Sequence, residues 1–384
     1  MIVAYILFWL AFLLVIHSYC FYPFIVLLWS HFKKQSETGV QPYVPTISLL
    51  MSVYNEESII VAKLKNIEAL EYPGNNIEIL IGSDCSSDNT LPLIKSFDSI
   101  PVRLFHFDRR RGKAAVLNDL VLAAKNDILV FSDANTFYAP DALHKMGRHF
   151  VDPEIGGVCG NLHLNASARN SGGKGEAVYW RYENSIKECE GKIRTTFGAT
   201  GGIYALRRNL YRKLPNDKAV TDDFLLPLSA ARQGFRVVYD ALVKGWEDTT
   251  SSTAYEFERK IRIGAQNFNG LVEVLPLLHP KYGFIAFGLF SHKLIRWIIP
   301  FLLMVIFVSS IVLSQQGGIY RWIFTAQIVF ACVASVGYIL DKISRPVMLF
   351  TLPYYFVVAN LGLLIGFFRF VKGSQKAAWS STRT

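Results

Sequence analysis

The sequence has few charged residues and few cysteines for its length. Charged side chains make up only 18% of the 384 residues and 51% are hydrophobic, whereas an ordinary soluble domain carries about a quarter charged residues. A chain with so many apolar side chains to bury is not intrinsically disordered. The cysteines are odd in number and scattered, with no Cys-x-x-Cys pair, which excludes a disulfide scaffold, gives no zinc site and suits a reducing, cytosolic compartment; they are Cys20, Cys85, Cys159, Cys189 and Cys332.

Acidic residues are outnumbered by basic ones. The chain has 30 aspartates and glutamates against 40 lysines and arginines, so the formal net charge is +10 and the isoelectric point is near 9.3. Such an excess favours binding to nucleic acid, or to an anionic membrane and a phosphorylated substrate. The basic residues gather at the ends of long apolar runs and near one polar segment, without an extended basic–aromatic stripe, which disfavours nucleic acid as a partner.

Four long apolar runs lie at the two ends of the chain. Ile2–Ser30 has no charged side chain and exceeds the roughly 20 residues that a helix needs to cross a bilayer. It is too long for a signal-peptide core and no small-residue cleavage site follows, so residues 1–30 are expected to be a retained transmembrane helix. Buried core helices are the alternative, and four terminal runs disfavour it. The other runs predict about three spans within residues 294–371, after an interfacial segment at 279–293: Leu294–Leu313, Trp322–Leu340 and Pro346–Phe368.

Basic residues set the expected orientation of these spans. Lys33 and Lys34 follow the first run at once, and cytoplasmic flanks carry the excess of lysine and arginine. Residues 31–278 are therefore expected to be the cytoplasmic domain of an integral protein of the bacterial inner membrane. Three C-terminal spans would place the tail, residues 372–384, outside, although it is basic. Either the tail is outside, or the last run, which Pro353 interrupts, is re-entrant or interfacial.

The polar middle of the chain alternates short β-type runs with helical patterns. The strand-like runs are rich in isoleucine, valine, leucine and phenylalanine: Ile47–Val53, Ile77–Ser83, Val102–His106 and Ile128–Phe131. Helical patterns lie between them at Glu57–Leu70, Asn89–Phe97 and Lys113–Ala124. This alternation predicts a Rossmann-like parallel sheet with helices on both faces. Ligands of such sheets bind beyond the carboxyl ends of the strands, so the polar residues there are the candidate site.

Polar side chains follow the first strand-like runs. Tyr54 and Glu56 follow the first run and Asp84 follows the second, where they can hydrogen-bond a base or ribose, or cap the next helix. No G-x-G-x-x-G segment is present, so an ordinary dinucleotide site is disfavoured. Lys113 ends a basic cluster at a helix start. Such a cluster can hold a diphosphate, and its alternative is a solvated run of charge.

Acidic side chains further along offer metal ligands and a base. Asp133 and Asn135 follow the fourth run and present two oxygens of the kind that Mg²⁺ or Mn²⁺ takes together with substrate phosphates; an Asx-turn is the alternative. Asp222 and Asp223 open a helical pattern, as simple first-turn acids or as the source of a general base. The glycine-rich segment 198–202, which lies between Asn135 and Asp222 in the sequence, lets the backbone approach a ligand closely.

In this order, the segments resemble those of the membrane-bound family 2 glycosyltransferases, which include cellulose, chitin and hyaluronan synthases. The resemblance covers about residues 45–300 and implies a GT-A fold facing the cytoplasm, with flanking spans. It implies that Asp223 is the catalytic base and that Asp133 and Asn135 hold the metal. The residues that it assigns to the nucleotide sugar are Tyr54, Glu56, Asp84, Lys113, Asp133 and Arg262, and those on the acceptor side are Gly201, Gly202 and Asp222.

Three positions depart from the family pattern. Asn135 replaces the second aspartate of D-x-D, which removes a charge from the metal site, and Asp222 stands where glutamate is usual. In a helix expected at Tyr255–Val274, Ile263 stands where processive synthases have the tryptophan on which an acceptor sugar stacks. That helix could also be a basic helix on anionic lipid. A second K-x-x-R-W segment, Lys293–Trp297, is interpreted as an interfacial anchor.

The expected function is the inverting, metal-dependent transfer of a sugar from a nucleotide sugar, with a UDP-sugar favoured, to a lipid-linked or polysaccharide acceptor at the membrane in cell-surface glycan synthesis. The missing tryptophan favours single additions. Two alternatives stay open, a processive synthase that extrudes its polymer and a non-catalytic membrane assembly subunit. The expected cofactor is Mg²⁺ or Mn²⁺, the expected partners include membrane lipids but no nucleic acid, and an oligomer is compatible with the sequence.

Overall fold

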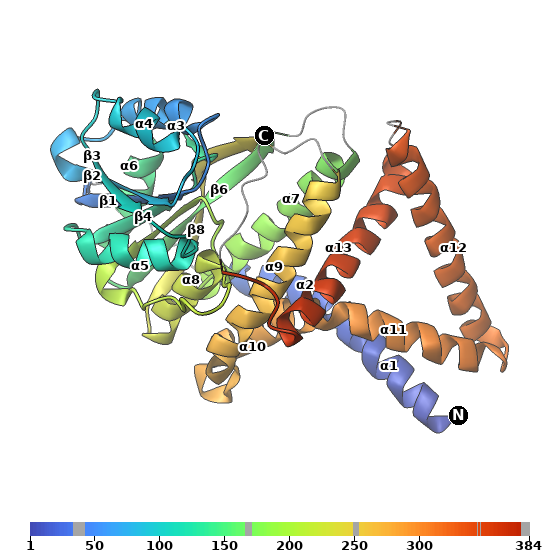
Figure 1. Ribbon diagram of the computed structural model, residues 1–384. Helices are drawn as coiled ribbons and strands as arrows, with labels where there is room; N and C mark the ends of the chain where they lie inside the picture. The colour runs from blue at the N-terminus through green and yellow to red at the C-terminus, as the bar shows by residue number, and fades with distance from the viewer. Residues whose placement is uncertain (34–42, 166–170, 249–252, 344, 346, 378–384) are drawn as a thin grey trace.

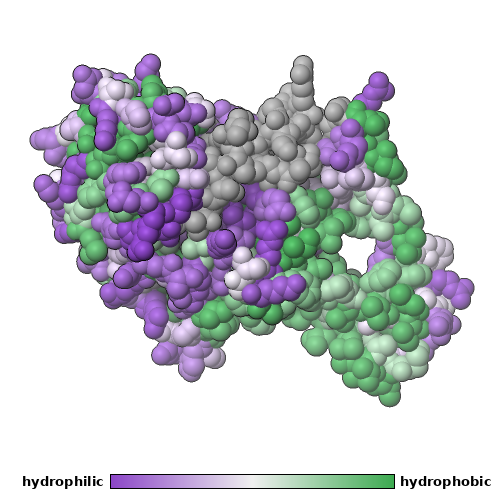
Figure 2. Space-filling view, in the orientation of Figure 1, coloured by the Kyte–Doolittle hydropathy of each residue, from purple (hydrophilic) through white to green (hydrophobic). Residues whose placement is uncertain are grey.

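The computed structural model describes residues 1–33, 43–165, 171–248, 253–343, 345 and 347–377 (Figure 1), with the backbone alone at 171–179 and 253–255. It combines an α/β part, built around one sheet, with long helices formed by the two ends of the chain. On the face shown in Figure 2, hydrophilic residues predominate on the α/β part and hydrophobic residues predominate on the long helices. The low overall charge content is therefore an average over two unlike parts.

In the described part of the chain, eight strands form one sheet in the order β3-β2-β1-β4-β7-β6-β8-β5. Strands β3, β2, β1 and β4 run parallel, and β7 is antiparallel to both β4 and β6. Strand β8 pairs parallel with β6 and antiparallel with β5. The strands are β1 (Ile47–Val53), β2 (Ile77–Asp84), β3 (Val102–Phe107), β4 (Ile128–Ser132), β5 (Phe137–Tyr138), β6 (Ile155–Asn165), β7 (Ile203–Arg207) and β8 (Arg236–Asp248).

The parallel half of the sheet confirms the alternation read from the sequence. Strand β1 has the predicted bounds, and β2, β3 and β4 each end one residue later than predicted. All seven residues of β1 are buried, because a parallel sheet is covered by helices on both faces. The helices of the α/β part are α3 (Ile60–Glu68), α4 (Thr90–Lys95), α5 (Lys113–Ala123), α6 (Ala142–Gly147), α7 (Ser171–Ile193), α8 (Asp222–Arg232) and α9 (Thr253–Val274).

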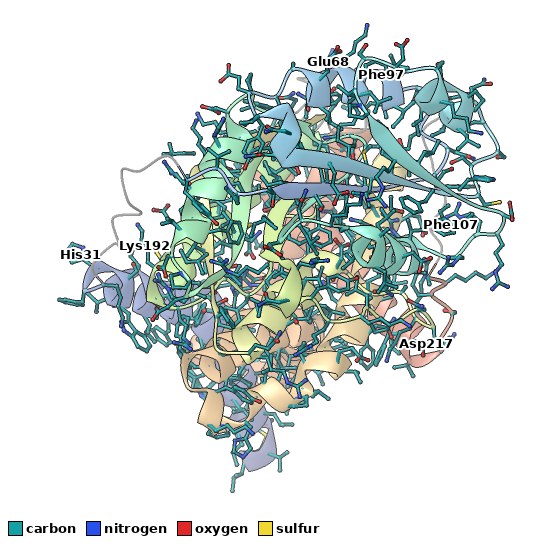
Figure 3. The ribbon with its side chains drawn as sticks, turned by 90° about the vertical axis from the view of Figure 1, so that its left-hand side faces the viewer. His31, Glu68, Phe97, Phe107, Lys192 and Asp217 are labelled. Atoms are coloured by element: carbon teal, nitrogen blue, oxygen red, sulfur yellow. The ribbon has the colours of Figure 1, made fainter. Side chains whose placement is uncertain are left out.

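Alternate residues of the parallel strands feed two hydrophobic cores. Leu50 packs on one face in a cluster with Leu117 of α5, and Leu49 packs on the other face with Leu64 of α3. Helix α4 lies beside α3 on that second face, where Figure 3 labels Glu68 and Phe97 close together. This two-sided burial follows from the period of two residues in a strand. It leaves the carboxyl edge of the strands open for polar side chains.

The N-terminal run forms one nearly continuous helix that packs on the C-terminal helices. It consists of α1 (Ile2–Ile16), a π-helical turn (His17–Phe21) and α2 (Tyr22–His31). Helix α1 lies beside α11 (Ile295–Ser314) in Figure 1, and Phe8 and Ala11 are buried in a cluster with Ile306 and Leu313. Two further long helices follow, α12 (Gly318–Lys342) and α13 (Met348–Val371).

Four helical stretches are long and apolar enough to cross a membrane, one N-terminal and three C-terminal, as the sequence predicts. Their bounds are Ile2–His31, Phe284–Ser314, Gly318–Lys342 and Met348–Val371. The start of the last predicted run, Pro346, and the part of the tail beyond Ala377 lie outside the described residues. Length and composition alone support these spans.

Helix α13 does not stand apart from the α/β part, because it runs along α9 (Figure 1). The two backbones approach so closely that a Cβ atom at Gly366 would lie 2.7 Å from the carbonyl oxygen of Ile261. Arg369 forms a 3.0 Å ion pair with Glu258 of α9. Beyond α13 the chain reaches Ala377, which lies against Gly112 at the start of α5. The end of the described chain therefore contacts the α/β part, an arrangement that favours a last helix that does not cross.

The segment expected at the membrane interface packs on the protein. Residues 279–293 include a 3₁₀ turn (Pro280–Tyr282), α10 (Phe284–Gly288) and most of a π-helical turn (Leu289–Leu294) that continues into α11. Leu289 is fully buried, and the ring of Phe197 fills the space where a Cβ atom at Gly288 would lie. The segment therefore packs against the loop that holds Phe197, and contact of the segment with a membrane surface stays a prediction.

Candidate active site

A cavity of about 880 Å³ opens at the carboxyl edge of the parallel strands. The end of β1, the loop after β4, the segment 198–202 and the start of α8 form one part of its lining, and α7, α9, α11 and α13 form most of the rest. The cavity therefore reaches from the sheet to the long apolar helices. The structure brings most of the expected site residues onto its lining: Glu56, Lys113, Asp133, Asn135, Gly201, Gly202, Asp222, Asp223 and Arg262.

Lys113 connects two of the candidate acids. It is the first residue of α5 and follows Gly112, whose φ of +86° is one that glycine adopts readily. The Nζ atom of Lys113 lies 2.8 Å from Asp133 Oδ1 and 3.0 Å from Asp222 Oδ1. Burial alone would lower the pKa of Lys113, but Asp133 and Asp222 raise it above its usual value. The ammonium group therefore stays charged, and it suits a diphosphate.

Asp223 is the candidate base whose surroundings favour proton transfer. Its side chain is part-exposed on the cavity, and its backbone carbonyl accepts a 2.7 Å hydrogen bond from the N–H of Ala199. Burial and then the neighbouring Asp222 carboxylate raise the pKa of Asp223 to about 6, while Lys113 and Lys187 act in the opposite direction. A carboxylate with this pKa is deprotonated at neutral pH and is still basic enough to take a proton.

Asp222 is engaged by the protein. One of its carboxylate oxygens accepts a 2.5 Å hydrogen bond from the hydroxyl of Tyr204, and the other lies at the Lys113 ammonium group. Its side chain is buried, although it lines the cavity. Of the two adjacent acids, Asp223 is therefore the one available to a substrate. The acceptor-side role of Asp222 stays a prediction.

The glycine-rich segment is needed because side chains crowd its backbone. A Cβ atom at Gly201 would lie 3.3 Å from Asp223 Oδ2, which is closer than most real Cβ contacts. A Cβ atom at Gly202 would lie 2.0 Å from Thr136 Oγ1 and would overlap it. These glycines allow Asp223 and the loop after β4 to lie against the same stretch of backbone, which brings the base close to Asp133.

Asp133 and Asn135 follow β4 and line the cavity with one carboxylate and one amide. Lys63, which is fully buried, donates a hydrogen bond to the carbonyl of Thr136, and its Nζ atom lies 4.5 Å from the centre of the Tyr138 ring. These contacts hold the loop after β4 in place. Mg²⁺ and Mn²⁺ take one or two such protein oxygens together with phosphate oxygens. Within the described part of the chain, no three His, Cys, Asp or Glu side chains gather to hold a metal, so donor phosphates would have to complete the site.

Tyr54 and Asp84 contact the turn before α5 rather than the cavity. The buried Asp84 carboxylate accepts hydrogen bonds from Arg110 Nε at 3.2 Å and from the N–H groups of Arg111 and Gly112 at 2.8 and 2.9 Å. The Arg110 guanidinium carbon lies 3.2 Å from the centre of the Tyr54 ring. A nucleotide base between Tyr54 and Asp84 would have to displace Arg110, so the nucleotide-binding role of these two residues stays a prediction.

Sequence analysis missed a set of cavity residues on the long helices and α7. Lys187, Lys293 and Arg296 line the same cavity as Asp223. The interpretation of Lys293–Trp297 as an interfacial anchor was wrong, because Trp297 is only 7% exposed and its ring centre lies 5.1 Å from that of Phe224. Residues 284–294 pack on the α/β part and turn the start of α11 inward. The sequence did contain a signal for these cavity residues, because Lys293 and Arg296 interrupt an apolar run.

The fold is GT-A-like, with a sheet whose first four strands are parallel, an Asp-x-Asn segment after β4 and two aspartates at the start of α8. The family model described as "Glycosyl transferase family 2" matches residues 48–214. The protein therefore contains a glycosyltransferase family 2 domain, as the order of its motifs predicts.

Two relatives agree with this family. The chain is 29% identical over 209 residues to the poly-beta-1,6-N-acetyl-D-glucosamine synthase of Staphylococcus aureus, across 52% of this chain and 49% of that protein. It is 26% identical over 203 residues to the beta-monoglucosyldiacylglycerol synthase of a Nostoc species, across 50% of this chain and 42% of that protein. The matched region thus spans about half the length of these relatives or less.

One solved structure shares the fold over nearly the whole chain. The mannosyltransferase PcManGT from Pyrobaculum calidifontis, solved in complex with GDP-Man and Mn²⁺, superposes with a TM-score of 0.70 at 21% identity. The superposition covers 93% of this chain and 99% of that protein. The likeness shows that the combination of an α/β domain with the flanking long helices is a shared fold.

Proposed function

We propose that the protein catalyses the inverting, metal-dependent transfer of a sugar from a nucleotide-sugar donor to an acceptor at the membrane, in cell-surface glycan synthesis. The observation that carries the proposal is one cavity that holds Asp223, the Lys113–Asp133 pair and a wall of long apolar helices. The Lys113 ammonium group suits the diphosphate of the donor. The end of the cavity beside the long apolar helices can be reached by an acceptor that is anchored in the bilayer of the cell membrane.

Asp223 acts as the general base in this proposal. Its carboxylate takes the proton of an acceptor hydroxyl while the hydroxyl oxygen bonds to the anomeric carbon of the donor sugar, and the bond from that carbon to the diphosphate oxygen breaks. Attack from the face opposite the leaving diphosphate inverts the anomeric configuration without a covalent enzyme intermediate. General-base assistance of this kind contributes about 10²–10⁴-fold in rate.

Cationic groups stabilise the negative charge that grows on the leaving diphosphate. Lys113 stays protonated, and Arg262 lines the same cavity. Positioned charges at a developing anion are often the largest contribution to catalysis. Asp133 and Asn135 would hold Mg²⁺ or Mn²⁺, which supplies further positive charge to the diphosphate when bound.

The acceptor is a lipid or a glycan at the membrane. The relatives are by name a polysaccharide synthase and a glycolipid synthase, which supports either class. Ile263, in the place where a processive synthase has its stacking tryptophan, favours the addition of single sugars. A domain facing the cytoplasm would meet nucleotide sugars directly, and a UDP-sugar is the favoured donor.

The test is a donor screen with purified full-length protein in detergent. Radiolabelled UDP-, GDP- and dTDP-sugars are supplied with a membrane lipid extract and Mg²⁺ or Mn²⁺, and each reaction is repeated with EDTA. We expect label from one donor to enter a lipid or glycan product, EDTA to stop the reaction, and product size to separate single addition from a polymer. Failure to transfer or hydrolyse any donor would refute the proposal.

A further inference from the structure

The turn before α5 places an arginine side chain against both Tyr54 and Asp84. Residues 108–112 form this turn and connect β3, which ends at Phe107 (Figure 3), to α5. The Arg110 guanidinium carbon lies 3.2 Å from the centre of the Tyr54 ring, and Arg110 Nε lies 3.2 Å from Asp84 Oδ2. We call this face of the Tyr54 ring, together with the Asp84 carboxylate, the Arg110 site.

The Arg110 site lies next to the cavity. Glu56, which follows Tyr54 by two residues, lines the cavity. Gly112 donates its N–H to Asp84 at 2.9 Å, and Lys113, the next residue along the chain, lines the cavity as well. A nucleotide whose diphosphate lies at the Lys113 ammonium group can therefore reach the Arg110 site with its base.

The Arg110 guanidinium makes contacts of the kind that a nucleotide base makes. It is planar, it lies over an aromatic face, and it donates N–H groups within its own plane. Bases stack on aromatic side chains in the same way, and the fully buried Asp84 carboxylate accepts N–H donors. A base that offers an N–H group can therefore replace the guanidinium at both of its contacts.

The guanidinium and a base do not fit on this face of the Tyr54 ring together. A base inserted between the two groups needs a contact of about 3.5 Å on each of its faces, whereas only 3.2 Å separates the centre of the Tyr54 ring from the guanidinium carbon. Arg110 therefore has to move before a base can stack there. Its side chain is 23% exposed, so it has a route to solvent.

The loops that form the Arg110 site are held to each other, which leaves the arginine side chain as the part that can move. Hydrogen bonds join the loop after β1 to the loop after β2. They run from the N–H of Asn55 to Ser86 Oγ at 3.2 Å and from the N–H of Glu56 to Thr90 Oγ1 at 2.7 Å. The ring and the carboxylate are therefore presented at a fixed separation, as a preformed binding site requires.

The backbone is strained in the same two loops. Asn55 follows Tyr54 with a φ of +50°, and Cys85 follows Asp84 with a φ of +61°. Residues other than glycine adopt such left-handed conformations uncommonly, and those that do cluster at ligand sites. The strain thus lies directly beside the two side chains that Arg110 contacts, which supports a ligand at this place.

We infer that Arg110 occupies the position that the base of the donor nucleotide takes, so that the guanidinium and the base compete for Tyr54 and Asp84. This inference rests on the proposed function and concerns how the donor enters its site. When Arg110 leaves, Asp84 keeps the N–H groups of Arg111 and Gly112, at 2.8 and 2.9 Å, so the carboxylate stays in place for the base. The apparent dissociation constant of the nucleotide is its intrinsic value divided by the fraction of molecules in which Arg110 has left.

Nucleotide binding to Arg110→Ala tests this competition. Full-length protein in detergent is titrated with UDP, GDP and dTDP in the presence of Mg²⁺, and the dissociation constants are measured by isothermal titration calorimetry. Arg109→Ala is the matched control, because Arg109 is exposed on the same turn and its replacement removes the same charge. We expect at least one nucleotide to bind Arg110→Ala about 3- to 30-fold more tightly than Arg109→Ala, the range that corresponds to one displaced cation–π contact.

A second variant separates stacking from charge and guards against misfolding of the first. Arg110→Lys keeps the charge but replaces the planar guanidinium by a strongly hydrated ammonium group, so the same nucleotide should bind it at least about twofold more tightly than it binds the wild type. A structure of the wild-type protein with this nucleotide bound gives a direct readout. In it, the guanidinium should have left the Tyr54 ring.

The outcomes separate this inference from the proposed function. Nucleotide binding that is no tighter in either Arg110 variant, or a bound base with Arg110 still on the Tyr54 ring, would overturn the inference. Transfer and hydrolysis of donor sugars are measured on the same samples. Tighter nucleotide binding in Arg110→Ala without transfer or hydrolysis of any donor refutes the proposed transferase, and transfer with unchanged nucleotide affinity in both variants refutes only the role of Arg110.

Discussion

Replacement of Asp223 by asparagine tests the proposed chemistry most directly. The substitution keeps the size of the side chain and removes its ability to take a proton. The backbone carbonyl of residue 223 would still accept the N–H of Ala199, and the Lys113–Asp133 pair lies on other elements. Donor binding should therefore persist, and transfer should fall by about 10²–10⁴-fold, which is the usual worth of a general base.

The raised pKa of Asp223 leads to a second, quantitative prediction, which concerns the pH dependence of the transfer rate. The base works only when it is deprotonated, so a pKa of about 6 means that the rate is level above about pH 7 and falls below pH 6. At pH 5 only about one tenth of the carboxylates remain ionised, so transfer should be about tenfold slower. Lys187 lowers this pKa, so Lys187→Gln should move the midpoint of the acidic limb to higher pH.

The assay is initial-rate transfer from the donor identified in the screen, with donor binding measured separately by equilibrium dialysis. Asp98→Asn is the matched control, because Asp98 is an exposed aspartate outside the cavity and its replacement should leave both quantities unchanged. Wild-type turnover in purified Asp223→Asn, or an acidic limb with a midpoint near 4 in the wild type, would show that Asp223 is not the base.

Four further changes test other parts of the structure. Asn135→Asp should lower the Mn²⁺ concentration for half-maximal transfer by about tenfold, because it restores a charged ligand. Glu190→Ala should cost about 3–5 kcal/mol of unfolding free energy, because it removes a fully buried carboxylate that pairs with His292 and accepts a hydrogen bond from Tyr22. Gly366→Leu should separate α13 from α9 and lower stability by about 1–3 kcal/mol. A protease-sensitive tag after the C-terminus should be cut from the same side of the membrane as the α/β part.

The two stability predictions have control variants, and the metal and topology predictions have defined contrary results. Glu188 lies on the helix of Glu190 with a side chain that is 43% exposed, so Glu188→Ala should change the free energy of unfolding by no more than about 0.5 kcal/mol. Ile365→Ala is the corresponding control beside Gly366. An unchanged Mn²⁺ requirement in Asn135→Asp would argue against a metal at that residue. Cleavage of the tag only from the opposite side would mean that the last helix crosses the membrane.

Much of the α/β part was predictable because its signals are local. The runs that became β1, β2, β3 and β4 are apolar over four to seven residues and are bounded by polar turns, so their bounds were right to within one residue. Parallel strands end at a common edge, and this geometry is why Asp133 and Lys113 were expected in one candidate site. The spans were equally local, because only length and apolar composition define them.

Contacts between distant segments were not predictable in the same way. Asp84 was expected to face a nucleotide, but its carboxylate binds the turn before α5, because three donors in that turn converge on it. The structure was also needed to show that the Asp222 carboxylate is held by other side chains of the protein, whereas the Asp223 carboxylate is available to a substrate. Tyr204, which occupies Asp222, lies 18 residues earlier and on a different element.

The sequence by itself determined the elements, the sheet edge that carries the polar residues and the four apolar helices, because each depends on neighbours in the chain. Only the tertiary structure decided that Trp297 is buried beside Phe224 and that Lys187 and Arg296 share a cavity with the base. It also decided that α13 lies along α9. These arrangements depend on how side chains from segments many tens of residues apart fit and pair, and neither hydrophobic periodicity nor motif spacing contains that information.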